Sequence, residues 1–336
     1  MLTVGIPVYN EDRYIEEAVL SVVRQADKII ISDNCSTDET EGVCRKLANA
    51  FPNIHYVRQP KNIGPIANFK FCLDEADSDY FMWLGSHDRV SPTYSSSLIS
   101  ILEMNHDAVM AFAPTEHISD LGEYVGTYDY SYSDELLHDD PFHRVLTIIK
   151  KLSEATMIHG IFRTRILKES WIEFAGFGPD VALLTRAVAK GKFIKVESER
   201  YIRRNARSET YADVIVRRER DLLNNDELIR LQPFYNLIVE QLNVIQSISS
   251  DKEIVSGWLK LASDCLERKY GPFSSAAFYK EYWLQSILFR NQGITRLLNK
   301  SNYNQIFIFG TGKLACYLYK DMELEGMRPK AFLDNH

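Results

Sequence analysis

The chain has 336 residues, of which 45% are apolar and 25% are charged, the composition of an ordinary globular protein. A length of this size predicts about two domains. Its 39 Lys and Arg against 46 Asp and Glu give a formal net charge of −7, which argues against broad binding to nucleic acid, because that binding depends on neutralising phosphates.

The five cysteines are scattered without a C-x-x-C pair. This spacing argues against a disulfide framework or a zinc site and favours a reducing compartment. The N-terminus lacks the pattern of a secretory signal peptide, and no apolar run approaches the ~20 residues of a membrane-spanning helix. We therefore expect a cytoplasmic protein and leave open peripheral contact with the inner face of a membrane.

Short apolar strands alternate with helices through the first half of the chain. Strands are expected at 2–6, 28–31, 54–57, 80–84 and 108–113. Helices are expected over 12–24, 38–50 and 65–75, and from about residue 92. Continuous apolar strands separated by such helices predict an α/β fold with a mainly parallel sheet covered on both faces. A hairpin or loop is expected over 121–133, followed by helix, strand and helix up to Lys195.

The pattern changes toward the C-terminus. From about Val214 to Lys300 it is almost wholly helical. Strands at 305–309 and 331–334 flank a Gly310-Thr311-Gly312 turn and a helix over 313–325, and Asp334 is a weak match to a nucleotide-binding fingerprint. We expect three parts: a nucleotide-binding domain over 1–213, a helical region over 214–300 and the truncated start of a Rossmann-like, doubly wound domain over 301–336.

Polar loops follow four of the predicted strands, at 7–11, 32–38, 58–64 and 85–88. In an open parallel sheet, ligands bind beyond the carboxyl ends of the strands. One Asp in such a place is structural more often than not, and Asp38 or Thr37 also suits a helix N-cap. Four polar loops on one edge favour a ligand site.

These loops resemble, in order and spacing, the motifs of family 2 glycosyltransferases, over roughly the first 210 residues. The matching segments are Pro7-Val8-Tyr9-Asn10-Glu11, Ile30 to Asp38, Asn62-Ile63-Gly64 and Leu84-Gly85-Ser86-His87-Asp88. The resemblance implies a GT-A fold over 1–213, a nucleoside-diphosphate sugar as donor, and a transferase of the hexosyltransferase class that inverts the anomeric centre.

The resemblance also assigns nine residues to the donor. They are Pro7, Val8, Tyr9 and Glu11 lining the nucleotide pocket, Asp33 accepting a hydrogen bond from the base, Arg58 and Asn62 bordering the same pocket, Ser86 bonding a ribose hydroxyl, and Arg204 near the diphosphate. Uracil is the base that the resemblance favours.

The metal motif departs from the family pattern. Asp88 matches the last position of D-x-D, where a carboxylate binds Mg²⁺ or Mn²⁺ bridging the diphosphate. Ser86 stands at the first acidic position, and His87 between them is either a ligand that suits Mn²⁺ better than Mg²⁺ or a loop histidine without a ligand. The sequence leaves metal dependence open.

An inverting transfer needs a general base that takes the proton of the acceptor hydroxyl. The segment Gly176 to Arg186 resembles the helix start that carries this acid in the family, which assigns the role to Asp180. The alternative is that Asp180 only favours the helix N-terminus electrostatically. Met157 to Arg163 resembles a strand on the acceptor side, with His159 either near the substrate or buried in the core.

These inferences predict transfer of a sugar from a nucleotide-sugar donor, most readily a UDP-sugar, to a growing surface glycan such as capsule or lipopolysaccharide. The expected acceptor is a glycan or lipid-linked glycan, and self-association is left open. The alternative is a non-catalytic nucleotide-sugar-binding or scaffold module, which Ser86 favours. A sugar nucleotidyltransferase is disfavoured, because no glycine-rich loop follows the first strand.

Overall fold

The computed structural model describes residues 1–173, 178–205, 234–270, 307–309 and 331–333. The chain divides into two compact units, residues 1–270 and 271–336. The expected boundary at residue 213 and the expected turn and helix over 310–325 lie outside the described residues.

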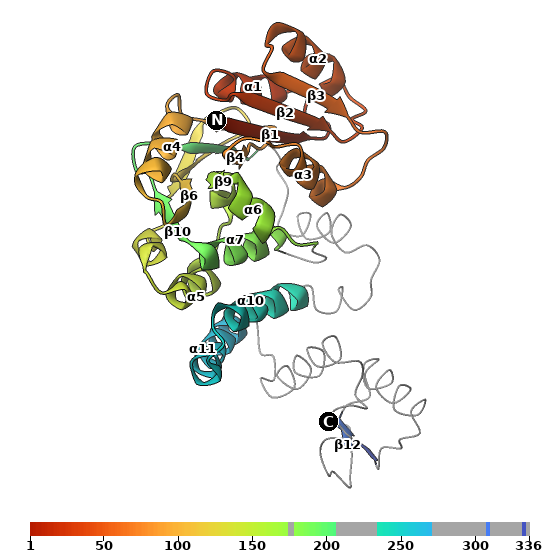
Figure 1. Cartoon of the computed structure of the whole chain (residues 1–336). Coiled ribbons are helices and arrows are strands. Elements are labelled where there is room, and N and C mark those ends of the chain that lie inside the picture. The colour runs from red at the N-terminus through yellow and green to blue at the C-terminus, as the bar shows by residue number, and fades with distance from the viewer. Residues whose placement is uncertain (174–177, 206–233, 271–306, 310–330, 334–336) are drawn as a thin grey trace. The chain divides into compact units, whose positions relative to one another are not determined.

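A seven-stranded sheet forms the centre of the first unit (Figure 1). The order of its strands is β10 (Lys192–Lys195), β6 (Ala108–Phe112), β9 (Ile161–Arg163), β4 (Tyr80–Trp83), β1 (Leu2–Val8), β2 (Lys28–Asp33) and β3 (Ile54–Arg58). Neighbouring strands are parallel except at β9, which runs antiparallel to β4 and β6. The prediction of a mainly parallel sheet is confirmed.

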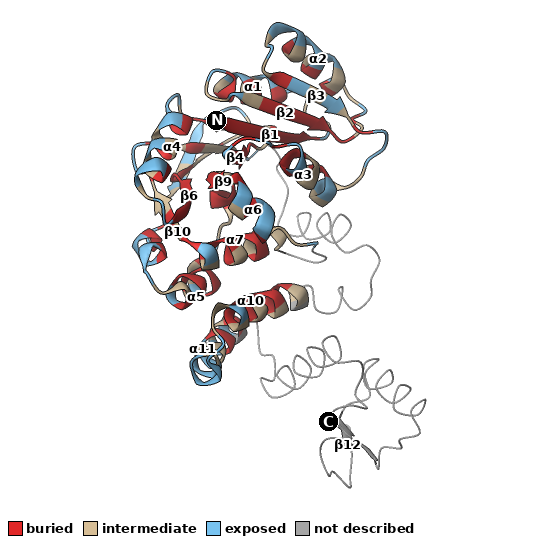
Figure 2. Ribbon diagram, in the orientation of Figure 1, coloured by how far each residue is buried: buried red, intermediate tan, exposed pale blue. Residues whose placement is uncertain are grey.

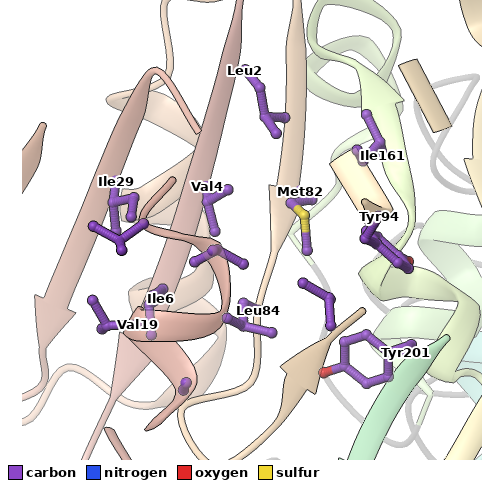
Figure 3. Close-up of a cluster of buried hydrophobic side chains, with 14 of the residues drawn as sticks. Leu2, Val4, Ile6, Val19, Ile29, Met82, Leu84, Tyr94, Ile161 and Tyr201 are labelled. Atoms are coloured by element: carbon purple, nitrogen blue, oxygen red, sulfur yellow. The ribbon is translucent and has the colours of Figure 1, made fainter. Parts of the chain in front are cut away.

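Helices cover the sheet on both faces. Helices α1 (Ile15–Val22) and α2 (Thr40–Ala50) lie on one face of β1 to β3, and α3 (Pro65–Asp74) lies on the other (Figure 1). Every residue of β1 is buried as a result, which is why this strand reads as an apolar run without alternation (Figure 2). Side chains of β1, β2, β4 and α1 form one buried cluster, which Tyr94 and Tyr201 join (Figure 3).

A second sheet of four strands lies beside the loop that follows β4. Its order is β5 (Arg89–Val90), β11 (Tyr201–Arg204), β7 (Thr115–Ile118) and β8 (Tyr124–Tyr128). Strands β7 and β8 form an antiparallel hairpin, of which only β8 lies within the range 121–133 where a hairpin or loop is expected. Because β5 begins directly after Asp88 and pairs with β11, the predicted metal motif and Arg204 come together.

Up to residue 205, the described part of the first unit also contains α4 (Tyr94–Met104), η1 (Ser133–Leu137), α5 (Pro141–Lys151), η2 (Thr156–His159), α6 (Thr164–Ser170) and α7 (Pro179–Lys190). The strand expected over 157–163 is a wrong prediction for its first half, because η2 is a 3₁₀ turn. The amides of Ile158 and Gly160 are bonded within this turn, to Ala155 and Met157, so the strand begins only at Ile161.

Two further helices, α10 (Tyr235–Ile248) and α11 (Lys252–Tyr270), pack against each other and against α5, and α10 also contacts α7. They confirm the helical expectation for part of 214–300. In the second unit, β12 (Phe307–Phe309) and β13 (Ala331–Leu333) pair in parallel, as expected for a strand–helix–strand unit. Within the part of the chain that the structure describes, no helix is both long and apolar enough to cross a membrane.

Candidate functional site

The loops after β1 and β2 are fastened to each other at the carboxyl edge of the sheet. The amide of Asn34 donates to the carbonyl oxygen of Val8 at 2.8 Å, and the amide of Asn10 donates to Ser36 Oγ at 3.0 Å. Asn10 Oδ1 in turn accepts from the amide of Thr37 at 2.8 Å. The two loops therefore form one hydrogen-bonded unit at this edge.

The side chains of the loop after β1, Pro7 to Glu11, differ in their exposure to solvent. Pro7 and Val8 are buried, whereas the side chain of Tyr9 is 42% exposed. Asn10 and Cys35 have φ angles of +54° and +63°, in the left-handed region that non-glycine residues rarely adopt. Such backbone strain is common in loops that bind ligands. Tyr9 is thus the residue of the motif whose ring is open to solvent.

Asp33 is fully buried, and three donors hold its carboxylate. Oδ1 accepts from the amide of Ser36 at 2.8 Å, and Oδ2 accepts from the hydroxyl of Tyr56 at 2.7 Å and from Arg58 Nη1 at 2.9 Å. Burial and the bond to Asp33 raise the pKa of Tyr56, which keeps its hydroxyl a donor. The contacts make Asp33 the anchor of the loop after β2, and its direct bond to a base stays a prediction.

Asn62 joins the same group of loops. Its Oδ1 accepts from Asn34 Nδ2 at 3.0 Å, while Asn34 Oδ1 accepts from the amide of Ile63 at 2.8 Å. The predicted neighbours Arg58 and Asn62 are therefore both fixed to the loop after β2. Their contact with a nucleotide is a prediction that these geometries support.

Asp88 is 4% exposed and is held by two donors from β11. The hydroxyl of Tyr201 donates to Oδ2 at 2.6 Å, and the amide of Arg204 donates to Oδ1 at 2.8 Å. Gly85 leaves the room for this arrangement, because a Cβ there would overlap the Asp88 carboxylate. Burial and the charge of Asp88 raise the pKa of Tyr201, so the hydroxyl stays protonated. Sequence alone gives no sign of Tyr201, which lies 113 residues from Asp88.

His87 lies between two carboxylates. Its Nδ1 is 3.3 Å from Glu11 Oε1, and its Nε2 is 3.8 Å from Asp88 Oδ1. Burial lowers the pKa of His87, but the bond to Glu11 and the charges of Asp88 and Glu11 outweigh it, and the pKa is raised. The side chain is still 33% exposed, whereas Ser86 is buried. The loop after β1 and the predicted metal motif Ser86-His87-Asp88 therefore meet at His87.

Arg204 does not present its guanidinium as expected. The residue is 5% exposed, and its Nη2 pairs with Glu17 Oε2 at 2.5 Å. Its Nη1 donates to the carbonyl oxygen of Asp120 at 3.1 Å, and its Nε donates to that of His87 at 3.3 Å. Because these donors are used within the protein, the geometry favours a structural role over the expected diphosphate contact. The neighbouring Arg203 has a side chain that is 39% exposed.

His159 is fixed by its Nδ1, which lies 3.0 Å from the carbonyl oxygen of Trp83 and must therefore carry the proton. Its ring stacks on that of Tyr201 with the centroids 4.6 Å apart and the planes at 3°. Burial lowers the pKa of His159 to about 4, so the ring is neutral at physiological pH. The ring therefore packs on Tyr201 while the residue keeps part of its exposure, and its contact with substrate stays a prediction.

Asp180 lies on a separate element, in the first turn of α7, where its Oδ1 accepts from the amide of Val181 at 2.9 Å. Gly178 precedes the helix with a φ of +84°, a conformation that glycine adopts without strain. Residues 176 and 177 of the matching segment lie outside the described residues. The role of Asp180 as a general base stays a prediction.

The side chains at this edge could supply only a small number of protein ligands to a divalent cation. Among the residues that the structure describes, no three His, Cys, Asp or Glu side chains could together hold a metal ion. Mg²⁺, however, is commonly held by one or two carboxylates together with substrate phosphates and water. Asp88, with His87 beside it, supplies that single carboxylate.

The strand order and the polar loops at one edge define an α/β domain of the GT-A type. The sequence model of glycosyl transferase family 2 matches residues 3–171, half of the chain, and the chain belongs to this family. In the solved structures, the chain resembles Staphylococcus aureus TarS 1–349 in complex with UDP-GlcNAc, with a TM-score of 0.60 and 17% identity over 85% of this chain and 79% of that one. At this identity the likeness shows the shared fold.

Two curated relatives match shorter stretches. The abequosyltransferase RfbV of Salmonella typhimurium is 34% identical over 114 residues, which cover 32% of this chain and 34% of the relative. TuaG of Bacillus subtilis, named for teichuronic acid biosynthesis, is 33% identical over 92 residues, which cover 26% of this chain and 36% of the relative. The matches thus span about a third of the length of these relatives.

Proposed function

We propose that this chain is an inverting glycosyltransferase that moves a sugar from a nucleoside-diphosphate donor, most readily a UDP-sugar, to a hydroxyl of a growing surface glycan. Membership of family 2 supports glycosyl transfer. The observation that carries the site is the meeting of the loops after β1 and β4, where His87 lies between Glu11 and Asp88. This is the edge at which open parallel sheets bind their ligands.

In the proposed site, the nucleotide lies against the loops after β1, β2 and β3. The exposed ring of Tyr9 offers a flat face on which a base can stack. Asp33 and Asn34 hold Arg58 and Asn62 in place beside it. Ser86 lies in the turn after β4, two residues before Asp88, and would bond a ribose hydroxyl of the same donor.

In the proposed reaction, the acceptor hydroxyl gives its proton to Asp180 while its oxygen attacks the anomeric carbon. The bond between that carbon and the diphosphate breaks, and the nucleoside diphosphate leaves with the electron pair. A divalent cation held by Asp88, with His87 as a further ligand, would supply Lewis-acid stabilisation of that leaving group. Arg203 adds a positive charge near this motif, since its charge acts on His87.

The proposed acceptor is a glycan or lipid-linked glycan of the cell surface, such as capsule or lipopolysaccharide. The relative named for teichuronic acid biosynthesis supports this class of product. The structure of TarS with UDP-GlcNAc supports a UDP-sugar as the donor class. We propose that the protein acts in the cytoplasm, where nucleotide sugars would reach it.

The general base is tested by Asp180→Asn. We expect sugar transfer to fall by about 10²- to 10⁴-fold, because a positioned base contributes about that much, while calorimetry shows unchanged UDP binding. Glu16→Gln, which removes an exposed acid from the first turn of α1, is the matched control for a helix-terminus effect. Full transfer activity in Asp180→Asn, with melting temperatures lowered equally in both variants, would reduce Asp180 to a helix-terminus residue.

A non-catalytic nucleotide-sugar-binding module is the second candidate, and the buried Ser86 in place of an acid favours it. Screening UDP-, GDP- and TDP-sugars by thermal shift identifies the donor, since a ligand that binds the native state raises its stability. UDP binding that is independent of Mn²⁺, without turnover of any donor, would support the module. Turnover that is lost in a chelator and restored by Mn²⁺ would support the metal-assisted transferase.

A further inference from the structure

The hydroxyl of Tyr201 bonds with the metal motif at two points. It donates to Asp88 Oδ2 at 2.6 Å and accepts from the amide of Gly85 at 3.3 Å. The residue is 1% exposed, and its ring belongs to the buried cluster that contains Leu84 and Tyr94 (Figure 3). The hydroxyl therefore has a fixed position relative to both ends of the Gly85–Asp88 turn.

The ring of Tyr201 is itself held by His159. The two rings are parallel within 3°, with their centroids 4.6 Å apart. His159 is tied to β4 through the carbonyl oxygen of Trp83 at 3.0 Å, and its own carbonyl oxygen accepts from the hydroxyl of Tyr94 at 3.2 Å. The end of β4, the η2 turn and β11 are thereby joined into one arrangement behind Asp88.

Asp88 depends on this arrangement because it lies in a loop outside regular structure. The amide of Arg204 fixes one of its carboxylate oxygens, and the hydroxyl of Tyr201 fixes the other. Two donors set the plane of a carboxylate, whereas one donor leaves it able to rotate. A phenylalanine would fill the same apolar space, so the hydroxyl at position 201 serves Asp88 rather than the core.

We infer that Tyr201 is a positioning residue that orients the Asp88 carboxylate toward the divalent cation that would bind the donor diphosphate, with His159 holding the Tyr201 ring in place. This inference rests on the proposed glycosyl transfer. A cation held by Asp88 would stabilise the negative charge that grows on the diphosphate as the bond breaks, so a misplaced Asp88 costs more in the transition state than in donor binding.

The test compares Tyr201→Phe with Tyr130→Phe in the full chain. Tyr130 is equally buried, and its hydroxyl bonds to Thr115 and Thr156 rather than to the motif. We expect Tyr201→Phe to lower kcat by about tenfold or more while the donor KM stays within about twofold, the pattern of a lost transition-state interaction. Tyr130→Phe should lower the melting temperature similarly and leave kcat within about twofold of the wild type.

A double-mutant cycle with Asp88→Asn separates positioning from general packing. If Tyr201 acts through Asp88, Tyr201→Phe causes no further loss in the Asp88→Asn background. Should Asp88→Asn leave no measurable turnover, the cycle is measured on the binding of UDP with Mn²⁺, because the terminal phosphate of UDP already carries the charge that the donor gains only as its bond breaks. An equal loss in both backgrounds, or an equal loss from Tyr130→Phe, would overturn the inference. Absence of donor binding and turnover in the wild type would instead overturn the proposed function, and this inference with it.

Discussion

Replacing Asp33 with asparagine should destabilise the first unit, although the two side chains have nearly the same shape. The backbone amide of Ser36 donates to one carboxylate oxygen, and Tyr56 and Arg58 donate to the other. Neither a backbone amide nor a guanidinium can accept a hydrogen bond. Whichever way the new amide turns, its NH₂ group therefore meets a donor at a site with no solvent exposure.

The cost follows from the contacts that are lost. A buried donor without a partner costs about 1–3 kcal/mol. Losing the carboxylate charge adds less than a fully buried ion pair would, because the Arg58 side chain keeps 29% of its exposure. We expect a total of about 2–4 kcal/mol, which corresponds to a fall in melting temperature of roughly 5–10 °C for a unit of this size.

Asp88→Asn is the matched control. Its NH₂ group can face the hydroxyl of Tyr201, which accepts as well as donates, while its oxygen keeps the amide of Arg204. The O–H of Tyr201 then has no acceptor, so we expect a loss of about 1–2 kcal/mol, smaller than for Asp33→Asn, where more than one donor loses its acceptor. Thermal melting followed by circular dichroism, with urea midpoints as a check, measures both variants. Equal melting temperatures for Asp33→Asn and Asp88→Asn would refute the claim that the lost hydrogen bonds around Asp33 cause its larger destabilisation.

Two further outcomes are expected. Gly85→Ala should lower both activity and stability, the latter by about 1–3 kcal/mol, because its Cβ would displace the Asp88 carboxylate. Gly42→Ala in α2 is its control, since a Cβ there meets no atom nearer than 3.6 Å, and it should raise stability by about 0.5 kcal/mol; equal melting temperatures of the two variants would contradict this reasoning. His159→Gln should lessen the loss of stability between pH 6.5 and 4, because the pKa of His159 is 6.5 unfolded and about 4 folded, so the unfolded chain takes up the proton first in that window. Urea unfolding at both pH values measures this effect, and an unchanged pH dependence would argue against a neutral, enclosed His159.

Local patterns were sufficient to predict five strands of the parallel part of the sheet, β1, β2, β3, β4 and β6, but gave no range for β10. Strand β1 is apolar at nearly every position because helices cover both of its faces. Strand β9 shows where this reasoning fails, because the three residues Ile161–Arg163 carry no signal for strand direction. Its antiparallel course follows from pairing with β4 and β6, which only the folded sheet defines.

The sequence by itself determined that the polar loops lie together, because the carboxyl ends of parallel strands meet at one edge whatever their order. Motifs that follow β1, β2 and β4 had to converge there. The tertiary structure decided which side chains remain available at that edge. Glu17 and Asp120, both remote in sequence, enclose the guanidinium of Arg204, while Arg203 stays partly exposed. Tyr201 reaches Asp88 only once β11 has paired with β5. Hydrogen bonds between distant segments depend on strand register and on packing, and local residue patterns predict neither of them.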